Sequence, residues 1–346
     1  MPSFFEIAQR KLTRTTHHIY TLPIVILMPH SRCNCRCVMC DIWQANHNMQ
    51  ELTEADLQPH LDSLRQLHVR WVVLSGGEAL MHSNLWTLCA MLKQENIKIT
   101  LLSTGLLLKK HAADIVRWCD EVIVSLDGSR DVHNAIRRIP RAYERLGEGV
   151  AALRALQADY RVTGRSVLQQ QNFRDLPHVI AAAHELGLDE ISFLTADVTT
   201  SAFNRQQIWG DDRVAEIALS PNEVVEFAAI VEQTISMYAD DFANGYVAEN
   251  AAKVRSFVRY YAALNGDGNF PPVHCNAPWV STVIEADGTV RPCFFHEALG
   301  NVRERPLADI LNSPQATNFR RNLDMAHDPI CRKCVCTLSL GARSEL

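Results

Sequence analysis

The sequence lacks any long apolar stretch, and this absence excludes a membrane-spanning protein. No apolar run approaches the length of a membrane span, and the first residues show neither the apolar core nor the cleavage site of a secretion signal. Charge of one sign is also scarce, because 34 Lys and Arg stand against 39 Asp and Glu, for a formal net charge of -5. We therefore expect a cytoplasmic protein that does not bind nucleic acid through bulk electrostatics.

The sequence also lacks internal repeats and low-complexity tracts. No period of about 20 to 50 residues recurs, which argues against a solenoid. The 346 residues suffice for one large α/β domain with an appended module, or for two ordinary domains.

Cysteine, in contrast, is abundant and unevenly distributed. Of the eleven cysteines, four lie between residues 33 and 40, and five lie between residues 275 and 336. An odd total without an export signal argues against a disulfide framework and favours metal ligation. Cys89 and Cys119 stand alone in helical stretches, where we expect them to be buried as small apolar residues.

Short apolar runs alternate with helical periodicity over the first half of the chain. The runs indicate buried parallel strands, and the alternation predicts about six βα units. We expect an α/β protein built on a partial (β/α)6 TIM-like barrel, with its active site at the carboxyl ends of the strands. The expected strands span residues 22–28, 71–74, 97–102, 122–126, 162–168 and 191–194. The expected helices span residues 53–67, 84–93, 109–118, 142–156 and 175–186.

The alternation ends after Asp197, where a polar, loop-like segment begins. Ser220 and Glu223 form the pattern of a capping box, which predicts the start of a helix. A second helix is expected over residues 247–264, and the Pro271-Pro272 pair then suggests a boundary.

The remaining residues predict a small C-terminal unit. Asp287-Gly288 lies between two apolar runs, 279–285 and 289–294, and predicts the turn of a β-hairpin. A last helix is expected over residues 306–323. The expected segments are an N-terminal extension (1–21), the partial barrel (22–197), a mostly helical insertion or linker (198–270) and a C-terminal hairpin and helix (271–346).

The first cysteine group follows the first expected strand. Cys33, Cys37 and Cys40 have the spacing Cys-x3-Cys-x2-Cys, which suits three irons of a cubane cluster but also a zinc knuckle. An iron-sulfur cubane normally takes four thiolates, so three leave one iron open for a distant cysteine or an external ligand. Cys35 does not fit this spacing, and we expect it to be a spectator.

Polar motifs follow the next three expected strands. They are Ser75-Gly-Gly-Glu78, Ser103-Thr-Gly105 and Ser125-Leu-Asp-Gly128, and Arg137 lies shortly after the last. Adjacent glycines let the backbone approach a ligand closely. Each motif taken alone is also consistent with a plain strand-to-helix turn.

The joint order of these motifs resembles the radical S-adenosylmethionine (radical SAM) enzymes over roughly residues 22–197. The resemblance implies a SAM-binding 4Fe-4S cluster on the first cysteine group, with SAM chelating the open iron and giving a 5′-deoxyadenosyl radical on reductive cleavage. It departs from the common family pattern at Met39 and at Ala79, neither of which is an expected ligand.

The same resemblance assigns the cofactor contacts. Gly76, Gly77 and Glu78 are expected at the methionine amino group and Ser103 at the amino or ribose side. Ser125 and Arg137 are expected at the carboxylate, which a planar guanidinium can hold with two parallel hydrogen bonds. Leu194 is also expected to contact the cofactor.

The second cysteine group flanks the expected hairpin. Twelve residues separate Cys275 from Gly288 and four separate Gly288 from Cys293; a Cys331-Arg-Lys-Cys334-Val-Cys336 stretch follows. Four thiolates in this arrangement suit either zinc or a 4Fe-4S cluster.

This region resembles the SPASM and twitch extensions of radical SAM enzymes. Five cysteines are too few for two complete clusters, so the twitch form with one auxiliary 4Fe-4S cluster is favoured. The resemblance implies ligation by Cys275, Cys293, Cys331 and Cys334, with Cys336 as the alternative to Cys334.

The substrate side is expected where the radical forms. Asp197 and Arg205 are the predicted catalytic residues, and Asn204, His296 and Glu297 are further candidates by position. Charged residues in such loops are often merely solvated.

The function expected from the resemblance is an oxidative radical SAM enzyme, similar to 2-deoxy-scyllo-inosamine dehydrogenase and to the anaerobic sulfatase-maturating enzymes. Hydrogen abstraction would be followed by loss of a proton and of an electron to the auxiliary cluster. The alternatives are a maturase that crosslinks a peptide, an epimerase, or a non-catalytic metal-binding module. Expected partners are a small-molecule or peptide substrate and a reductant such as flavodoxin or ferredoxin.

Overall fold

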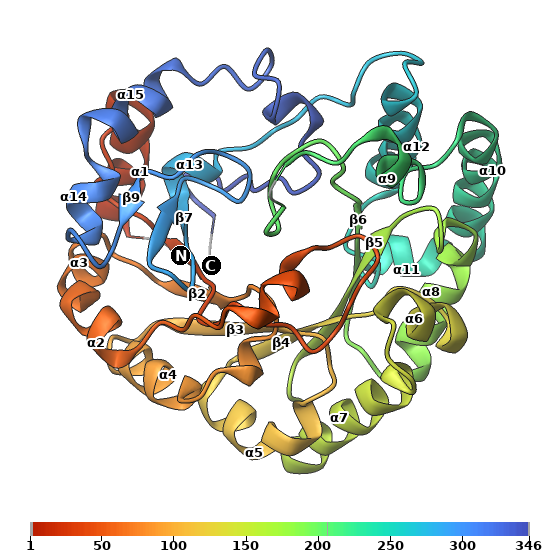
Figure 1. Cartoon of the computed structure of the whole chain (residues 1–346), viewed down its shortest axis with the longest axis horizontal. Helices are drawn as coiled ribbons and strands as arrows, with labels where there is room; N and C mark the ends of the chain where they lie inside the picture. Colours follow the sequence, from red (N-terminus) through yellow and green to blue (C-terminus); the bar gives the residue numbers. More distant parts are fainter. Residues whose placement is uncertain (1–2, 206, 345–346) are drawn as a thin grey trace.

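The computed structural model describes residues 3–205 and 207–344 and shows one curved, nine-stranded sheet (Figure 1). Its strands follow the order β6-β5-β4-β3-β2-β1-β7-β8-β9. The strands are β1 (Ile24–Leu27), β2 (Trp71–Leu74), β3 (Lys98–Ser103), β4 (Glu121–Ser125), β5 (Val162–Leu168), β6 (Ile191–Thr195), β7 (Ser281–Ile284), β8 (Thr289–Arg291) and β9 (Gly300–Asn301).

The first six strands are parallel and adjacent in sequence order, as the apolar runs predict. The helices between them lie along the outer, convex side of the sheet, while the segment after β1 crosses its inner side (Figure 1). The helices are α1 (Phe4–Thr16), α2 (Glu54–Leu57), α3 (Leu61–Gln66), α4 (Leu85–Gln94), α5 (Leu108–Trp118), α6 (Arg130–Arg137), α7 (Ala142–Leu156), α8 (Leu176–Glu185), α9 (Asp211–Ala215), α10 (Pro221–Met237), α11 (Ala239–Asn244), α12 (Ala251–Leu264), α13 (Ala277–Val280), α14 (Leu307–Leu311) and α15 (Pro314–Asn322).

The strands contribute many fully buried side chains to the core. Leu74, Ile99, Leu101, Val122 and Val124 are each exposed by no more than 1%. Such runs are typical of parallel strands covered on both faces. The α/β class and the six-stranded partial barrel are therefore confirmed.

The expected hairpin forms, and it extends the barrel sheet. β7 pairs in parallel with β1, while β7 and β8 pair antiparallel. Gly288 lies at the turn with φ of 86° and donates its N–H to the carbonyl of Glu285 at 2.9 Å. Trp279 does not begin the strand as expected, because it lies in α13.

Two expected helices differ from the structure within the barrel and the insertion. The helix over residues 53–67 is interrupted by a 3-10 turn at Gln58–His60, where Pro59 has no N–H to donate. The helix expected from residue 247 begins instead at Ala251, where the Asn250 side chain accepts the N–H of Lys253.

The last expected helix, over residues 306–323, is two helices. α14 ends at Leu311, and α15 starts at Pro314 with Ser313 as its N-cap. A serine N-cap followed by proline is a helix-start signal, and Ser313-Pro314 divides the single helix expected here into two.

No helix within residues 3–205 and 207–344 is long and apolar enough to cross a membrane.

Candidate active site

The first cysteine group lies on a loop that the surrounding backbone fixes in place. The loop leaves β1 and returns beside its own start, since Leu52 donates its N–H to the carbonyl of Pro29 at 3.0 Å. The Asn46 side chain bonds both the N–H and the carbonyl of Cys33, each at 2.9 Å. The loop is therefore held in place by the protein's own hydrogen bonds.

The three expected cluster thiols are sheltered from water. Cys37 is 6% exposed, and Cys33 and Cys40 are half-buried. Apolar neighbours including Val38 and Ile136 pack around them. Burial, followed by the charge of Cys37, raises the pKa of Cys40 to about 12. Three sheltered sulfurs so close together suit a metal cluster, which binds cysteines as thiolates.

Cys35 lies within the same group but is the most buried of the four, at 1% exposure. A hydrogen bond from the Cys35 thiol lowers the pKa of Cys37 to about 7. Cys35, the expected spectator, therefore affects the pKa of Cys37, which is an expected ligand.

The two glycines after β2 are required by the close approach of the cysteine loop. A Cβ on Gly77 would lie 2.1 Å from the carbonyl oxygen of Arg32, and one on Gly76 would lie 3.2 Å from that of His30. Gly76 also has φ of 102°. Only glycine fits at these positions.

Glu78 is fully buried and already saturated with donors. Its carboxylate accepts the hydroxyls of Ser103 and Thr104 at 3.0 and 2.6 Å, together with the N–H groups of Thr104 at 2.8 Å and Leu80 at 3.2 Å. Burial raises the pKa of Glu78, and the Thr104 bonds oppose that shift. The structure thus brings Glu78 and Ser103 together with Thr104, the middle residue of the Ser103-Thr-Gly105 motif, to which the resemblance assigns no contact.

Arg137 lies between the cysteine loop and β4. Its Nη1 lies 3.4 Å from the sulfur of Cys37, and its Nη2 pairs with the buried carboxylate of Asp127. Its Nε is buried without a hydrogen-bond partner among the described residues. This Nε–H is therefore available to a ligand, and the expected contact with the SAM carboxylate stays a prediction.

Ser125 and Leu194 lie at the same edge of the sheet. Both are half-buried, Ser125 opposite Arg165 and Leu194 opposite Val167 in the strand register. The structure places them at the carboxyl ends of β4 and β6, as expected of cofactor contacts, and their roles stay predictions.

The two predicted catalytic residues are paired with each other. Arg205 donates to the Asp197 carboxylate at 2.6 Å and to its carbonyl at 2.7 Å, and both side chains are at most 2% exposed. The guanidinium also stacks on Trp209, 3.7 Å from the ring centroid. This pair therefore shapes the loop after β6, and a direct role in chemistry stays a prediction.

The same loop contacts the first cysteine loop. Trp209 donates its indole N–H to Asp41 at 2.8 Å, and the Asn204 side chain donates to the carbonyl of Asp41 at 3.3 Å. Asp41 directly follows the third cluster cysteine. No sequence signal pointed to this contact, because it joins segments that are distant along the chain.

The five C-terminal cysteines gather at a second centre. All are half-buried, and burial raises the pKa of Cys293 to about 11 and that of Cys334 to about 12, with Cys275 nearby in both cases. The sulfur of Cys331 lies 3.3 Å from Nε2 of His296. This sulfur-rich, half-buried donor set fits an iron-sulfur cluster.

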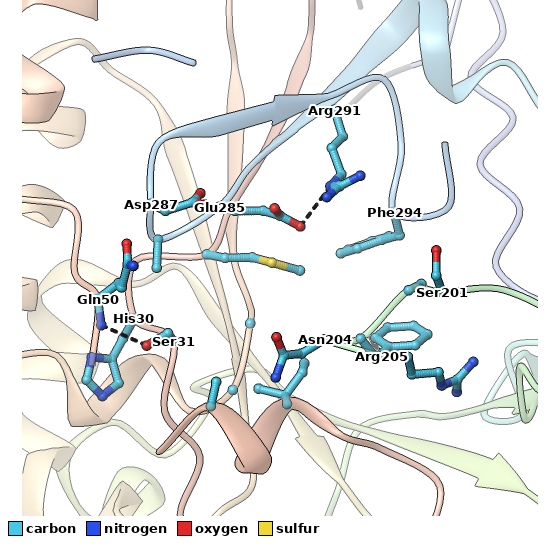
Figure 2. Close-up of a pocket in the computed structure, with 18 of the residues that line it drawn as sticks. His30, Ser31, Gln50, Ser201, Asn204, Arg205, Glu285, Asp287, Arg291 and Phe294 are labelled. Carbon is cyan, nitrogen blue, oxygen red and sulfur yellow. Dashed lines mark hydrogen bonds and ion pairs between the residues drawn. The ribbon is translucent and has the colours of Figure 1, made fainter. Parts of the chain in front are cut away.

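A cavity of about 470 Å³ lies between the two cysteine regions. Figure 2 shows residues of three segments around it, with Ser31 near the first cysteine loop, Asn204 on the loop after β6, and Glu285 paired with Arg291 on the β7–β8 hairpin. The Glu285–Arg291 ion pair spans 3.0 Å. Phe294, which directly follows Cys293, also lines the cavity.

Several of the predicted site residues reach this cavity. Gly76, Gly77, Asn204, Arg205 and Glu297 line it. The hairpin residues that form its opposite wall were not predicted, because β7 joins the barrel sheet only in the tertiary structure.

Comparisons with known families agree with the two cysteine centres. The Radical SAM superfamily matches residues 27–196, and the iron-sulfur cluster-binding domain called SPASM matches residues 275–335. The chain therefore contains a Radical SAM domain and a C-terminal SPASM domain. Its cofactors are 4Fe-4S clusters and S-adenosylmethionine.

Relatives with similarity to this chain differ in their reactions. The chain is 23% identical to Fe-coproporphyrin III synthase of Methanosarcina barkeri, over 93% of this chain and 84% of that one. It is 26% identical to PqqA peptide cyclase of Granulibacter bethesdensis, over 88% and 77% respectively. With pre-heme d1 synthase of Dinoroseobacter shibae it shares 28% identity, over 49% of this chain and 42% of that one.

Solved structures show the same fold. Streptococcus suis SuiB bound to its precursor peptide SuiA superposes with a TM-score of 0.63 at 14% identity, over 90% of this chain and 70% of that one. The enzyme anSMEcpe with bound AdoMet also has a TM-score of 0.63, at 18% identity over 86% and 82%. At these identities the solved structures speak for the fold alone. The Radical SAM and SPASM matches are what support a radical SAM enzyme.

Proposed function

We propose that this chain catalyses an oxidation in which a substrate in the 470 Å³ cavity loses a hydrogen atom and then one electron and one proton. Cys33, Cys37 and Cys40 would hold the cluster that binds SAM, and reductive cleavage of SAM there would supply a 5′-deoxyadenosyl radical to accept the hydrogen atom. The second cluster is the proposed acceptor of the electron, and flavodoxin or ferredoxin is the proposed reductant of the first.

The position of the cavity is the observation that supports this proposal. Gly76 and Ser31 line one side, next to the first cysteine loop, and Phe294, next to Cys293, lines another. A bound molecule is therefore flanked by both cysteine centres. After loss of the hydrogen atom, a two-electron oxidation requires an acceptor for one more electron, and a cluster on the C-terminal cysteines would supply it near the cavity.

The remaining residues of the site are proposed to position the reactants. Arg137 offers its Nε to the SAM carboxylate, while Glu78 keeps Ser103 and Thr104 in place beneath the glycine turn. The Asp197–Arg205 pair holds the loop that forms one wall of the cavity.

Cysteine variants test the assignment of the two clusters. Anaerobically reconstituted wild type should hold about eight irons, and with dithionite it should cleave SAM to 5′-deoxyadenosine. C33A/C37A/C40A should keep about four irons and cleave no SAM. C275A/C293A/C331A/C334A should also keep about four irons and still cleave SAM, but should form no oxidised product.

Cys89→Ala is the matched control, because this thiol is buried in α4 away from both centres. Its iron content and activity should equal those of the wild type. Zinc instead of iron in the C-terminal centre, or a product at the same oxidation level as its substrate, would contradict the proposed oxidation.

Peptide modification is the second candidate reaction. The similarity to PqqA peptide cyclase over 88% of this chain supports it. Incubation with candidate peptides tests this reaction, with SAM turnover and the mass of the peptide product as the readouts.

A further inference from the structure

His296 lies at the C-terminal cysteine centre in a position that neither the proposed cluster ligands nor the cavity explains. It follows Cys293 by three residues and is 6% exposed. Its ring meets Phe319 of α15 edge-on, with the centroids 5.0 Å apart. Its carbonyl accepts a hydrogen bond from Arg291 at 3.2 Å. Backbone and ring are therefore both fixed.

The ring points one nitrogen at two acceptors. Nε2 of His296 lies 3.3 Å from the sulfur of Cys331 and 3.8 Å from the Asp328 carboxylate. The three groups form a compact cluster, with their ligand atoms within 4.8 Å of one another. A carboxylate only accepts, and so does a cluster-bound thiolate, so the neutral imidazole places its proton on Nε2.

Asp328 fixes the position of the sulfur relative to the ring. Its Oδ1 accepts the N–H of Cys331 at 2.8 Å and that of Ile330 at 3.0 Å. The carboxylate thus fixes the turn that contains Cys331. Of the two acceptors near Nε2 of His296, the sulfur is the closer.

We propose that His296 is a positioning residue that donates its Nε2–H to the sulfur of Cys331 and thereby raises the reduction potential of the auxiliary cluster. Hydrogen bonds to cluster sulfurs stabilise the reduced, more negative state, and they are among the main determinants of cluster potential. A higher potential makes the cluster a better acceptor for the electron of a substrate radical. The inference rests on the proposed role of Cys331 as a cluster ligand.

The experiment isolates the auxiliary cluster and measures its potential. In the C33A/C37A/C40A background, only the C-terminal centre should hold iron, and its midpoint potential is read by an electron paramagnetic resonance titration. His296→Phe keeps an aromatic ring against Phe319 but cannot donate, so its potential should move to a more negative value. His296→Gln retains an N–H donor and should restore part of the shift.

His327→Phe is the matched control. His327 directly precedes Asp328, is exposed, and its Nδ1 lies 2.7 Å from the Asp324 carboxylate. Its removal should leave the potential unchanged.

Each contrary outcome has a distinct meaning. An unchanged potential in His296→Phe, with about four irons retained, overturns the inference and leaves the cluster assignment intact. A loss of iron in His296→Phe but not in His327→Phe overturns it in favour of direct ligation by the histidine. A background variant without iron overturns both the inference and the ligand assignment.

Discussion

At the scale of single residues, most predicted site side chains make contacts within the protein itself. Glu78 accepts from Ser103 and Thr104, and Asp197 pairs with Arg205. The sequence placed these residues near the carboxyl ends of the strands, and their roles in the site stay predictions. The sequence did not reveal that both carboxylates accept hydrogen bonds from other groups of the protein, because the fold determines which groups lie within reach.

The glycine turn gives the sharpest prediction at this scale. Gly77→Ala would place a methyl group 2.1 Å from the carbonyl oxygen of Arg32, so the cysteine loop must move. We expect this variant to lose most of the iron held by the first cysteine group, measured as iron per chain in a background without the C-terminal ligands.

Gly210→Ala provides the comparison, since nothing among the described residues lies within 4 Å of an added Cβ there. It should keep the wild-type iron content. Normal iron binding by Gly77→Ala would show that the loop can shift without losing the cluster.

At the scale of elements, the edge of the sheet at β6 is covered by an irregular segment. Val247 bridges Ile191 in parallel, and Ala248 donates its N–H to the carbonyl of Ile191 at 3.0 Å. The Glu249 carboxylate accepts the N–H of Phe193 at 2.8 Å. These contacts satisfy an edge that would otherwise be open to other chains.

Glu249 makes this element sensitive to pH. Burial raises the pKa of its carboxyl to about 7 from a reference value of 4.5. The folded protein then binds more protons than the unfolded chain between these values, so stability falls as pH rises through that window. Between pH 5 and pH 7, the wild type should lose about 1 to 3 kcal/mol of unfolding free energy relative to Glu249→Gln.

Urea unfolding of both proteins at several pH values measures this difference. Glu304→Gln, a change at an exposed position, should show the same pH dependence as the wild type. If the unfolding free energies of the wild type and of Glu249→Gln changed in parallel with pH, the predicted link between Glu249 protonation and stability would be contradicted.

At the scale of the whole molecule, the regions that hold the two cysteine groups share one sheet. β7 pairs with β1 over four residues, Ile24↔Ser281 to Leu27↔Ile284. The N-terminal helix also contacts the other end of the chain, where Arg10 donates to the carbonyl of Ser344 at 2.8 Å. The four-part division of the chain stays a prediction, and the pairing joins two of its parts.

This pairing predicts cooperative unfolding. The apoprotein should unfold in a single transition, because losing the C-terminal region would expose the β1 edge. Tryptophan fluorescence and far-ultraviolet circular dichroism should give coincident denaturant curves. Two separated transitions would show that the C-terminal region is stable apart from the barrel.

The six parallel strands, most of the helices between them and the chemical class of this protein follow from the sequence alone. Apolar runs and helical periodicity depend on neighbours along the chain, and so do the Cys-x3-Cys-x2-Cys spacing and the glycine turn. Cys33, Cys37, Cys40 and the five C-terminal cysteines could therefore be grouped from their spacing along the chain.

The way in which these parts face one another depends instead on the tertiary structure. The pairing of β7 with β1, the hydrogen bond from Trp209 to Asp41 and the approach of His296 to Cys331 each bring together groups from different segments. Such contacts depend on the packing of the entire sheet. The cavity between the two cysteine centres follows from that packing, and no local pattern in the sequence encodes it.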